Sequence, residues 1–175
     1  MKKVLKFVLG LVLVLVLGFF AAGLVIPTLS YETSVEVERP VETAWRVFMD
    51  GERMSQWMTN LQRVETIAGE PGMVGSQFRL VFDENGEEVV VSEMVTEVRK
   101  HEVYAFTIES DSVGGNAAVR FEDLGMRTRV TIRNELQGQN PVWQSLIVIS
   151  QGFMRDRQLE QLNKLKQLIE SADDV

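Results

Sequence analysis

The sequence predicts an α+β fold in which a curved antiparallel sheet of about six to seven strands wraps around one long C-terminal helix, plus one N-terminal transmembrane helix. Three patterns predict it: an uncharged apolar run at the N-terminus, short segments of period-two alternation separated by glycine-bearing links, and helical periodicity at the end of the chain. With 175 residues, the chain has room for one domain and a short appendage. We therefore assign residues 1–30 to an N-terminal transmembrane anchor with a short linker, and residues 31–175 to the domain.

The N-terminal segment has the length and composition of a membrane-spanning helix. Residues 7–30 contain no charged side chain. A helix over residues 4–26 would rise about 34 Å, which exceeds the hydrocarbon core of about 30 Å. Because Lys2, Lys3 and Lys6 precede the run and acidic residues follow it, the positive-inside rule predicts a single-pass protein. Its N-terminus would be cytoplasmic and its domain would lie on the extracytoplasmic (periplasmic) side.

A cleaved signal peptide is the alternative for the same segment. The small residues Ala21, Ala22 and Gly23 would suit a signal peptidase. However, the apolar run is longer than the usual signal-peptide core of about 7 to 15 residues, and cleavage there would leave an apolar mature end. These two features favour an uncleaved anchor.

The domain begins with a strand and two short helices. Residues 31–38 alternate apolar and polar side chains, which predicts a half-buried strand. Pro40 suits the first turn of a helix whose apolar positions reach Met49, and a second short helix follows to about Trp57.

Further strands follow, each predicted by alternation and bounded by turn residues. They cover residues 77–82, 88–98, 103–109, 117–122 and 128–134. The links between them are short, so an antiparallel meander is the natural connection.

The C-terminal helix is predicted to begin at Asn140 and Pro141, because Asn caps helices and Pro is favoured at the first position. No proline interrupts the chain from there to about Ser171, so we expect one long amphipathic helix. Gly152 lies inside it at a cost of about 1 kcal/mol relative to Ala, and we interpret it as a place where another group approaches the backbone.

Several stretches resemble a known superfamily. The segment VEVERPVETAWRVFMDGERMSQW resembles the opening of START-like (SRPBCC) proteins, which include the polyketide cyclase/dehydrase and lipid transport family. The likeness continues through GEPGMVGSQFR, VTEV, LGMRTRVTI and LEQLNKLKQLIE, and covers residues 31–170. The resemblance implies a helix-grip fold. It assigns no catalytic residue, because these motifs are turns, a helix start and core positions, and the superfamily shares no catalytic residue.

Composition excludes several classes of function. The net charge of −7 argues against nucleic acid as a partner, because phosphates require a basic surface. The absence of cysteine and the single histidine argue against a metal site, and we expect no cofactor. His101 is interpreted as a solvated turn residue, and Ser76 lacks the context of a nucleophile, so no catalytic residue is assigned.

A ligand cavity is predicted from the dimensions of the fold. Seven strands at about 4.8 Å spacing make a sheet about 34 Å wide, whereas a helix is only about 10 to 12 Å across. The sheet must therefore curl, and the remaining space is filled by large side chains or by a guest. The candidate cavity residues are Trp57, Phe78, Leu80, Phe82, Tyr104, Phe106, Ile108, Val119, Phe121, Leu146, Ile149, Phe153 and Met154.

The sequence therefore favours a membrane-anchored binder or carrier of a lipid or other hydrophobic small molecule, without enzymatic activity. Its predicted partners are the membrane, through the N-terminal helix, and that hydrophobic molecule; no protein partner is indicated. Two alternatives stay open: a cyclase or dehydratase acting on a hydrophobic polyketide-like substrate, and a scaffold with a filled core.

Overall fold

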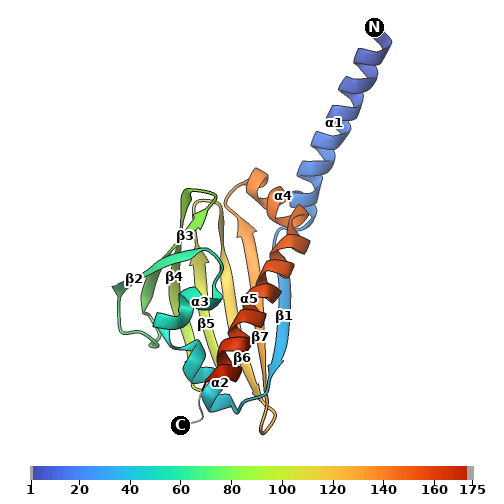
Figure 1. Cartoon of the computed structure of the whole chain (residues 1–175). Coiled ribbons are helices and arrows are strands. Elements are labelled where there is room, and N and C mark those ends of the chain that lie inside the picture. Colours follow the sequence, from blue (N-terminus) through green and yellow to red (C-terminus); the bar gives the residue numbers. More distant parts are fainter. Residues whose placement is uncertain (1, 173–175) are drawn as a thin grey trace.

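The computed structural model describes residues 2–172 and confirms the α+β helix-grip architecture (Figure 1). The sheet is antiparallel throughout, with strand order β1-β7-β6-β5-β4-β3-β2. The elements are α1 (Lys2–Val25), β1 (Leu29–Val37), α2 (Val41–Phe48), the 3-10 turn η1 (Gly51–Arg53), α3 (Met54–Trp57), β2 (Leu61–Ala68), β3 (Gln77–Glu84), β4 (Glu87–Arg99), β5 (Val103–Glu109), β6 (Val113–Asp123), β7 (Thr128–Gly138), α4 (Pro141–Ile149) and α5 (Gln151–Ser171).

The strands agree with the predicted segments, with one addition. β5 has the predicted bounds, and the other predicted strands are somewhat longer than expected. β2 was not predicted, because its apolar residues Leu61, Val64 and Ile67 recur every third residue. A bulge between Leu61 and Arg63 shifts the register there, so strict alternation is lost although the segment still pairs with β3.

The predicted long C-terminal helix is confirmed as α5, but its predicted span from Asn140 is wrong, because the chain bends at Ser150 and residues 141–149 form the separate helix α4. The Ser150 hydroxyl donates a hydrogen bond to the carbonyl of Leu146, and such a bond bends helices. The predicted start is confirmed: the Asn140 side chain accepts hydrogen bonds from the backbone N–H groups of Val142 and Trp143, at 3.0 and 3.1 Å. At the first helix of the domain, Pro40 occupies the cap position before α2 rather than its first turn.

The interpretation of Gly152 as a close-approach site is also wrong. A Cβ added to Gly152 would have no atom within 4 Å, so this position faces open space.

The helix α5 crosses the concave side of the sheet and closes the core at one side. Its residues Leu162, Leu165 and Ile169 are fully buried. The main contacts of α5 are with β1, α2, α3 and α4. The helix therefore covers the β1 side of the sheet most closely (Figure 1).

The helix α1 projects from the domain but is joined to it at its last turn (Figure 1). Gly23 is buried against α4, and a Cβ at Gly23 would lie 2.6 Å from the Ser145 Oγ. The Gln144 Nε2 donates a hydrogen bond of 2.6 Å to the Ile26 carbonyl, and the Gln137 Nε2 donates one of 2.8 Å to the Thr28 Oγ1. An 18-residue stretch of α1 has a mean hydropathy of 2.9, so this helix is long and apolar enough to cross a membrane, as a signal sequence also is.

Candidate functional site

The concave face of the sheet can be followed through the strand register, because directly opposite residues of antiparallel strands share a face. Tyr104 and Phe106 pack against the main core, and Ile108 packs against a second cluster beside α4. Glu93 is directly opposite Ile108 on one side and Phe78 on the other. Glu93 therefore lies on the concave face, among apolar side chains.

One end of this face is filled. Phe48 of α2 lies 6.1, 5.6 and 5.4 Å, between ring centroids, from Trp57, Tyr104 and Phe121 respectively. These distances are typical of packed aromatic pairs. The filled-core alternative therefore describes this end of the domain, where α2 and α3 supply the cover.

The other end is less covered. We define the open concave face as the inward-facing, partly exposed residues Phe78, Phe82, Val91, Glu93, Phe106 and Ile108. Next to it, the inward-facing Val64 and Val89 are 37% and 38% exposed. Large apolar side chains in the middle of a sheet are normally covered, so this surface is suited to an apolar guest.

The predicted cavity residues fall into three groups. Trp57, Leu80, Val119 and Phe121 are buried. Phe78, Phe82, Tyr104, Phe106, Ile108 and Met154 are partly exposed. Leu146, Ile149 and Phe153 are exposed by 40%, 62% and 68%, so they are not part of the packed interior.

Glu93 is the residue that sequence reasoning missed. Burial raises the pKa of its carboxyl to about 7, from an ordinary value of 4.5. Within residues 2–172 no cation or hydrogen-bond donor is paired with this carboxyl. The signal was present in the sequence, because Glu93 takes the inward phase of β4 between Val91 and Val95.

Tyr104 is a second polar group on the same face. Its pKa is raised to about 12, first by burial and second by the negative charge of Glu93. The two groups therefore interact electrostatically across the concave face, although no hydrogen bond joins them.

A different polar cluster, near β1, is satisfied internally. The Asn134 Nδ2 donates a hydrogen bond of 3.1 Å to the Gln158 Oε1, and the Gln158 Nε2 donates one of 3.0 Å to the Ile132 carbonyl. Burial raises the pKa of Tyr31 to about 12, and its hydrogen bond with Asn134 opposes this shift. Because these groups pair with one another, the cluster fastens α5 to the sheet.

Two polar contacts hold α5 to the opposite side of the domain. The Arg157 guanidinium forms an ion pair with Glu84 at the end of β3. The Lys164 Nζ donates a hydrogen bond of 3.2 Å to the Thr59 Oγ1, in the link before β2. Together they fix the position of α5 above the sheet.

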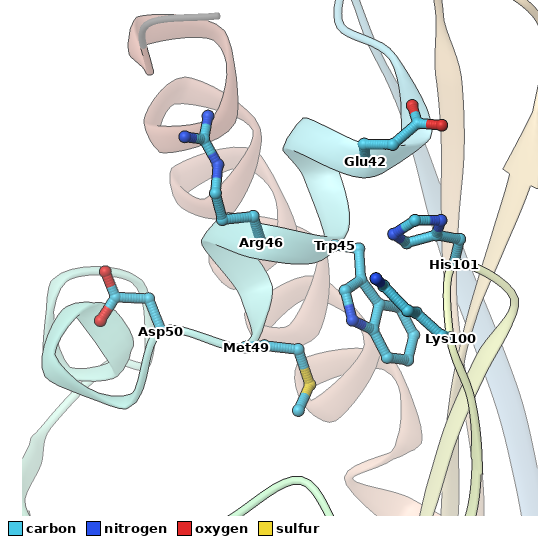
Figure 2. A pocket seen from close by; sticks show the side chains of 7 residues that line it. All are labelled: Glu42, Trp45, Arg46, Met49, Asp50, Lys100 and His101. Atoms are coloured by element: carbon cyan, nitrogen blue, oxygen red, sulfur yellow. The ribbon is translucent and has the colours of Figure 1, made fainter. Parts of the chain in front are cut away.

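A separate, shallow pocket of about 580 Å³ lies between α2 and the turn that joins β4 to β5 (Figure 2). Its lining residues are Glu42, Trp45, Arg46, Met49, Asp50, Lys100 and His101. Trp45 and His101 pack edge to face, with ring centroids 6.1 Å apart, so His101 is not the freely solvated residue expected from the sequence. No cluster of three metal-binding side chains occurs here or elsewhere in the described part of the chain.

The sequence profile of the family described as polyketide cyclase/dehydrase and lipid transport matches residues 28–170. None of the curated proteins matches the chain.

Solved structures with the same fold are numerous. The Zhui aromatase/cyclase from Streptomyces sp. R1128 has a TM-score of 0.70 and 16% identity, over 82% of this chain and 94% of that chain. A conserved protein from Geobacillus kaustophilus has a TM-score of 0.68 and 15% identity, over 81% and 95%. A START superfamily protein from Mycobacterium smegmatis has a TM-score of 0.64 and 18% identity, over 79% and 98%. At these identities the likeness shows the fold alone.

Proposed function

Because the chain belongs to the polyketide cyclase/dehydrase and lipid transport family, we propose that it is a membrane-anchored, non-enzymatic binder of a lipid or another hydrophobic small molecule. The observation that carries the proposal is the open concave face, where large apolar side chains surround one carboxyl and remain partly exposed.

The anchor is supported by the junction between α1 and the domain. The last turn of α1 packs on α4 through Gly23, and Gln144 binds the carbonyl of Ile26. A signal peptide is removed after export and has no need of such contacts with the mature domain. We therefore favour an uncleaved helix, with the N-terminal lysines on the cytoplasmic side and the domain on the extracytoplasmic side.

The proposal that a ligand binds is supported by the free energy that would be released when the open concave face is covered. Fully burying one large apolar side chain is worth about 1.5 to 3 kcal/mol. Covering Phe78, Phe82, Phe106 and Ile108, each already partly buried, would gain about half of this per residue, or about 3 to 6 kcal/mol in total. The cost of association reduces this sum, so a guest must also cover neighbouring surface.

Glu93 indicates which kind of hydrophobic molecule fits. A protonated carboxyl both donates and accepts a hydrogen bond, and a partner inside the open concave face would lower the cost of burying it. The preferred ligand therefore carries a hydroxyl, carbonyl, carboxyl or amine at one end of an apolar body.

The same residue favours one alternative, a cyclase or dehydratase. A carboxyl with a pKa near 7 exchanges protons readily at neutral pH, which is what a general acid or base requires. In that case Glu93→Gln would abolish turnover of a polyketide-like substrate while leaving its binding largely intact.

The binding proposal can be tested with a photoreactive fatty acid that carries a diazirine on its chain. The full chain, reconstituted in liposomes, would be irradiated with this probe, and the labelled residues would be mapped by mass spectrometry. We expect labels on the concave face of β3 to β5, and separately on α1, which serves as the internal control for the membrane anchor.

A matched pair of variants isolates the concave face. Val91→Trp places a large side chain on the inner face of β4, whereas Val90→Trp places the same side chain on its outer face. Labelling of β3 to β5 should be lost in the first variant and kept in the second. If labelling of the wild type is confined to α1, the proposal that the concave face binds a ligand is refuted. If α1 is not labelled, the proposal that α1 is a membrane anchor is refuted.

A further inference from the structure

The helix α4 has an inverted distribution of polarity. Two of its three buried side chains are polar, Gln144 and Ser145 at 8% and 0% exposed, and the third is the apolar Ile147 at 5%. Its exposed side chains include Val142, Leu146 and Ile149, at 47%, 40% and 62%. A helix on the surface of a soluble protein shows the opposite pattern, with its apolar stripe toward the core.

The exposed apolar side chains form one continuous stripe that extends into α5. Val142, Leu146, Ile149 and Phe153 recur at spacings of three or four residues, so they share a side of the bent helix pair. No charged residue occurs between Glu135 and Arg155. Trp143, which is 38% exposed, lies beside the stripe, and Trp is a residue type enriched at membrane interfaces. We call Val142, Trp143, Leu146, Ile149 and Phe153 the α4 stripe.

The buried polar residues of α4 explain the inversion, because they hold α1. Ser145 is the residue against which Gly23 packs, and Gln144 binds the Ile26 carbonyl at the point where α1 ends. The inner side of α4 is therefore a binding surface for the end of α1. A different side of α4, which carries the α4 stripe, is exposed close to the end of α1.

We propose that the α4 stripe inserts into the interfacial layer of the same membrane that α1 crosses, so that the domain is held against the lipid surface at two places. This inference rests on the anchor in the proposed function. A helix of the length of α1 rises about 36 Å, so its last turn, where α4 is attached, lies at the edge of a hydrocarbon core of about 30 Å. An uncharged apolar stripe at that depth is covered by lipid instead of water.

This attachment places the open concave face near the membrane. One row of paired residues crosses the sheet from Leu29, close to the end of α1, through Leu136, Gly115 and Ile108 to Glu93. The hairpin between β3 and β4 extends beyond this row and lies at the same end of the domain as α4 (Figure 1). A molecule leaving the bilayer would therefore enter at the end of the sheet that carries Glu93.

The chain contains no cysteine, so single cysteines can report the depth of chosen positions. Three variants of the full chain would carry an environment-sensitive nitrobenzoxadiazole label: Phe153→Cys on the α4 stripe, Leu13→Cys in the middle of α1, and Met126→Cys. Met126 is 75% exposed, similar to Phe153, but lies in the turn between β6 and β7 at the far end of the sheet. Each would be reconstituted in phosphatidylcholine and phosphatidylglycerol vesicles with and without spin-labelled lipid, which quenches the label on contact.

We expect the labels at residues 153 and 13 to lose most of their fluorescence to the spin-labelled lipid, and the label at residue 126 to lose little. Ile149→Cys is a second reporter on the stripe and should behave like residue 153. If the labels at residues 149 and 153 are quenched as little as the label at residue 126, while the label at residue 13 is quenched strongly, the insertion of the α4 stripe is refuted. The membrane anchor is supported in that case. If residue 13 also fails to respond, the membrane anchor itself is refuted, and this inference with it.

Discussion

Replacing Glu93 by Gln should stabilise the protein at alkaline pH and leave it unchanged in acid. The folded-state pKa of about 7 is higher than the ordinary value of 4.5. Between these two values the folded protein retains a proton that the unfolded chain has released, so the free energy of unfolding falls as the pH rises. The loss is complete above about pH 7, and it is absent below the ordinary pKa.

The size of this effect follows from the separation of the two pKa values. At 1.36 kcal/mol per pH unit, the separation corresponds to about 3 kcal/mol, and access of water to the partly exposed carboxyl reduces it to about 2 to 3 kcal/mol. Gln has the same shape and no charge, so Glu93→Gln should be more stable than the wild type by this amount at pH 8. The two proteins should be equally stable at pH 4.

Urea unfolding of the full chain in detergent micelles, followed by the fluorescence of the buried Trp45 and Trp57, would measure the difference. Glu97→Gln is the control, because Glu97 lies on the same strand but is exposed and paired with Arg99 at 2.8 Å. It should show no gain at pH 8. Equal stability of Glu93→Gln and the wild type at pH 8 would mean that the carboxyl is hydrated, and the reasoning about the concave face would fail.

Three further predictions concern the helices α1, α4 and α5 that surround the sheet. Leu165→Ala, at a fully buried position of α5, should lower the free energy of unfolding by about 2 to 5 kcal/mol in urea titrations. Leu159→Ala, 39% exposed on the same helix, should cost under about 1 kcal/mol, and equal losses would contradict the packing of α5. Gly23→Leu should push α1 away from α4 and speed proteolysis of residues 26–30, because its Cβ would lie 2.6 Å from the Ser145 Oγ; Gly10→Leu, with no neighbour within 4 Å, should not. Asn140→Ala removes the cap of α4 and should cost about 1 kcal/mol by the same titrations, whereas an unchanged midpoint would show that the cap contributes nothing.

The strands and the start of the C-terminal helical region could be predicted because their signals are local. Alternation along residues 103–109 follows directly from the geometry of a half-buried strand, and β5 has these bounds. Asn140 and Pro141 act on the backbone within one turn, so their role in starting the helix could be predicted without knowledge of the fold.

Features that depend on pairing or bending were not predictable in this way. The bulge in β2 changes which residues face inward, and only the pairing with β3 reveals it. The bend at Ser150 coincides with a hydrogen bond from its side chain to the Leu146 carbonyl, and it divides the helical region into α4 and α5. Leu146, Ile149 and Phe153 were therefore expected opposite the sheet and are found on the surface.

The sequence by itself determined the antiparallel sheet, the long helix over it and the apolar N-terminal helix, because hydrophobic period and charge are properties of short segments. Only the tertiary structure decided which part of the concave face is packed and which part stays partly exposed. That outcome depends on where α2, α3 and α5 come to rest, since side chains far apart in the chain must meet to cover a surface. The position of Glu93 belongs to the same category: its charge is visible in the sequence, but its burial among Phe78, Val91 and Ile108 exists only once β3, β4 and β5 have paired.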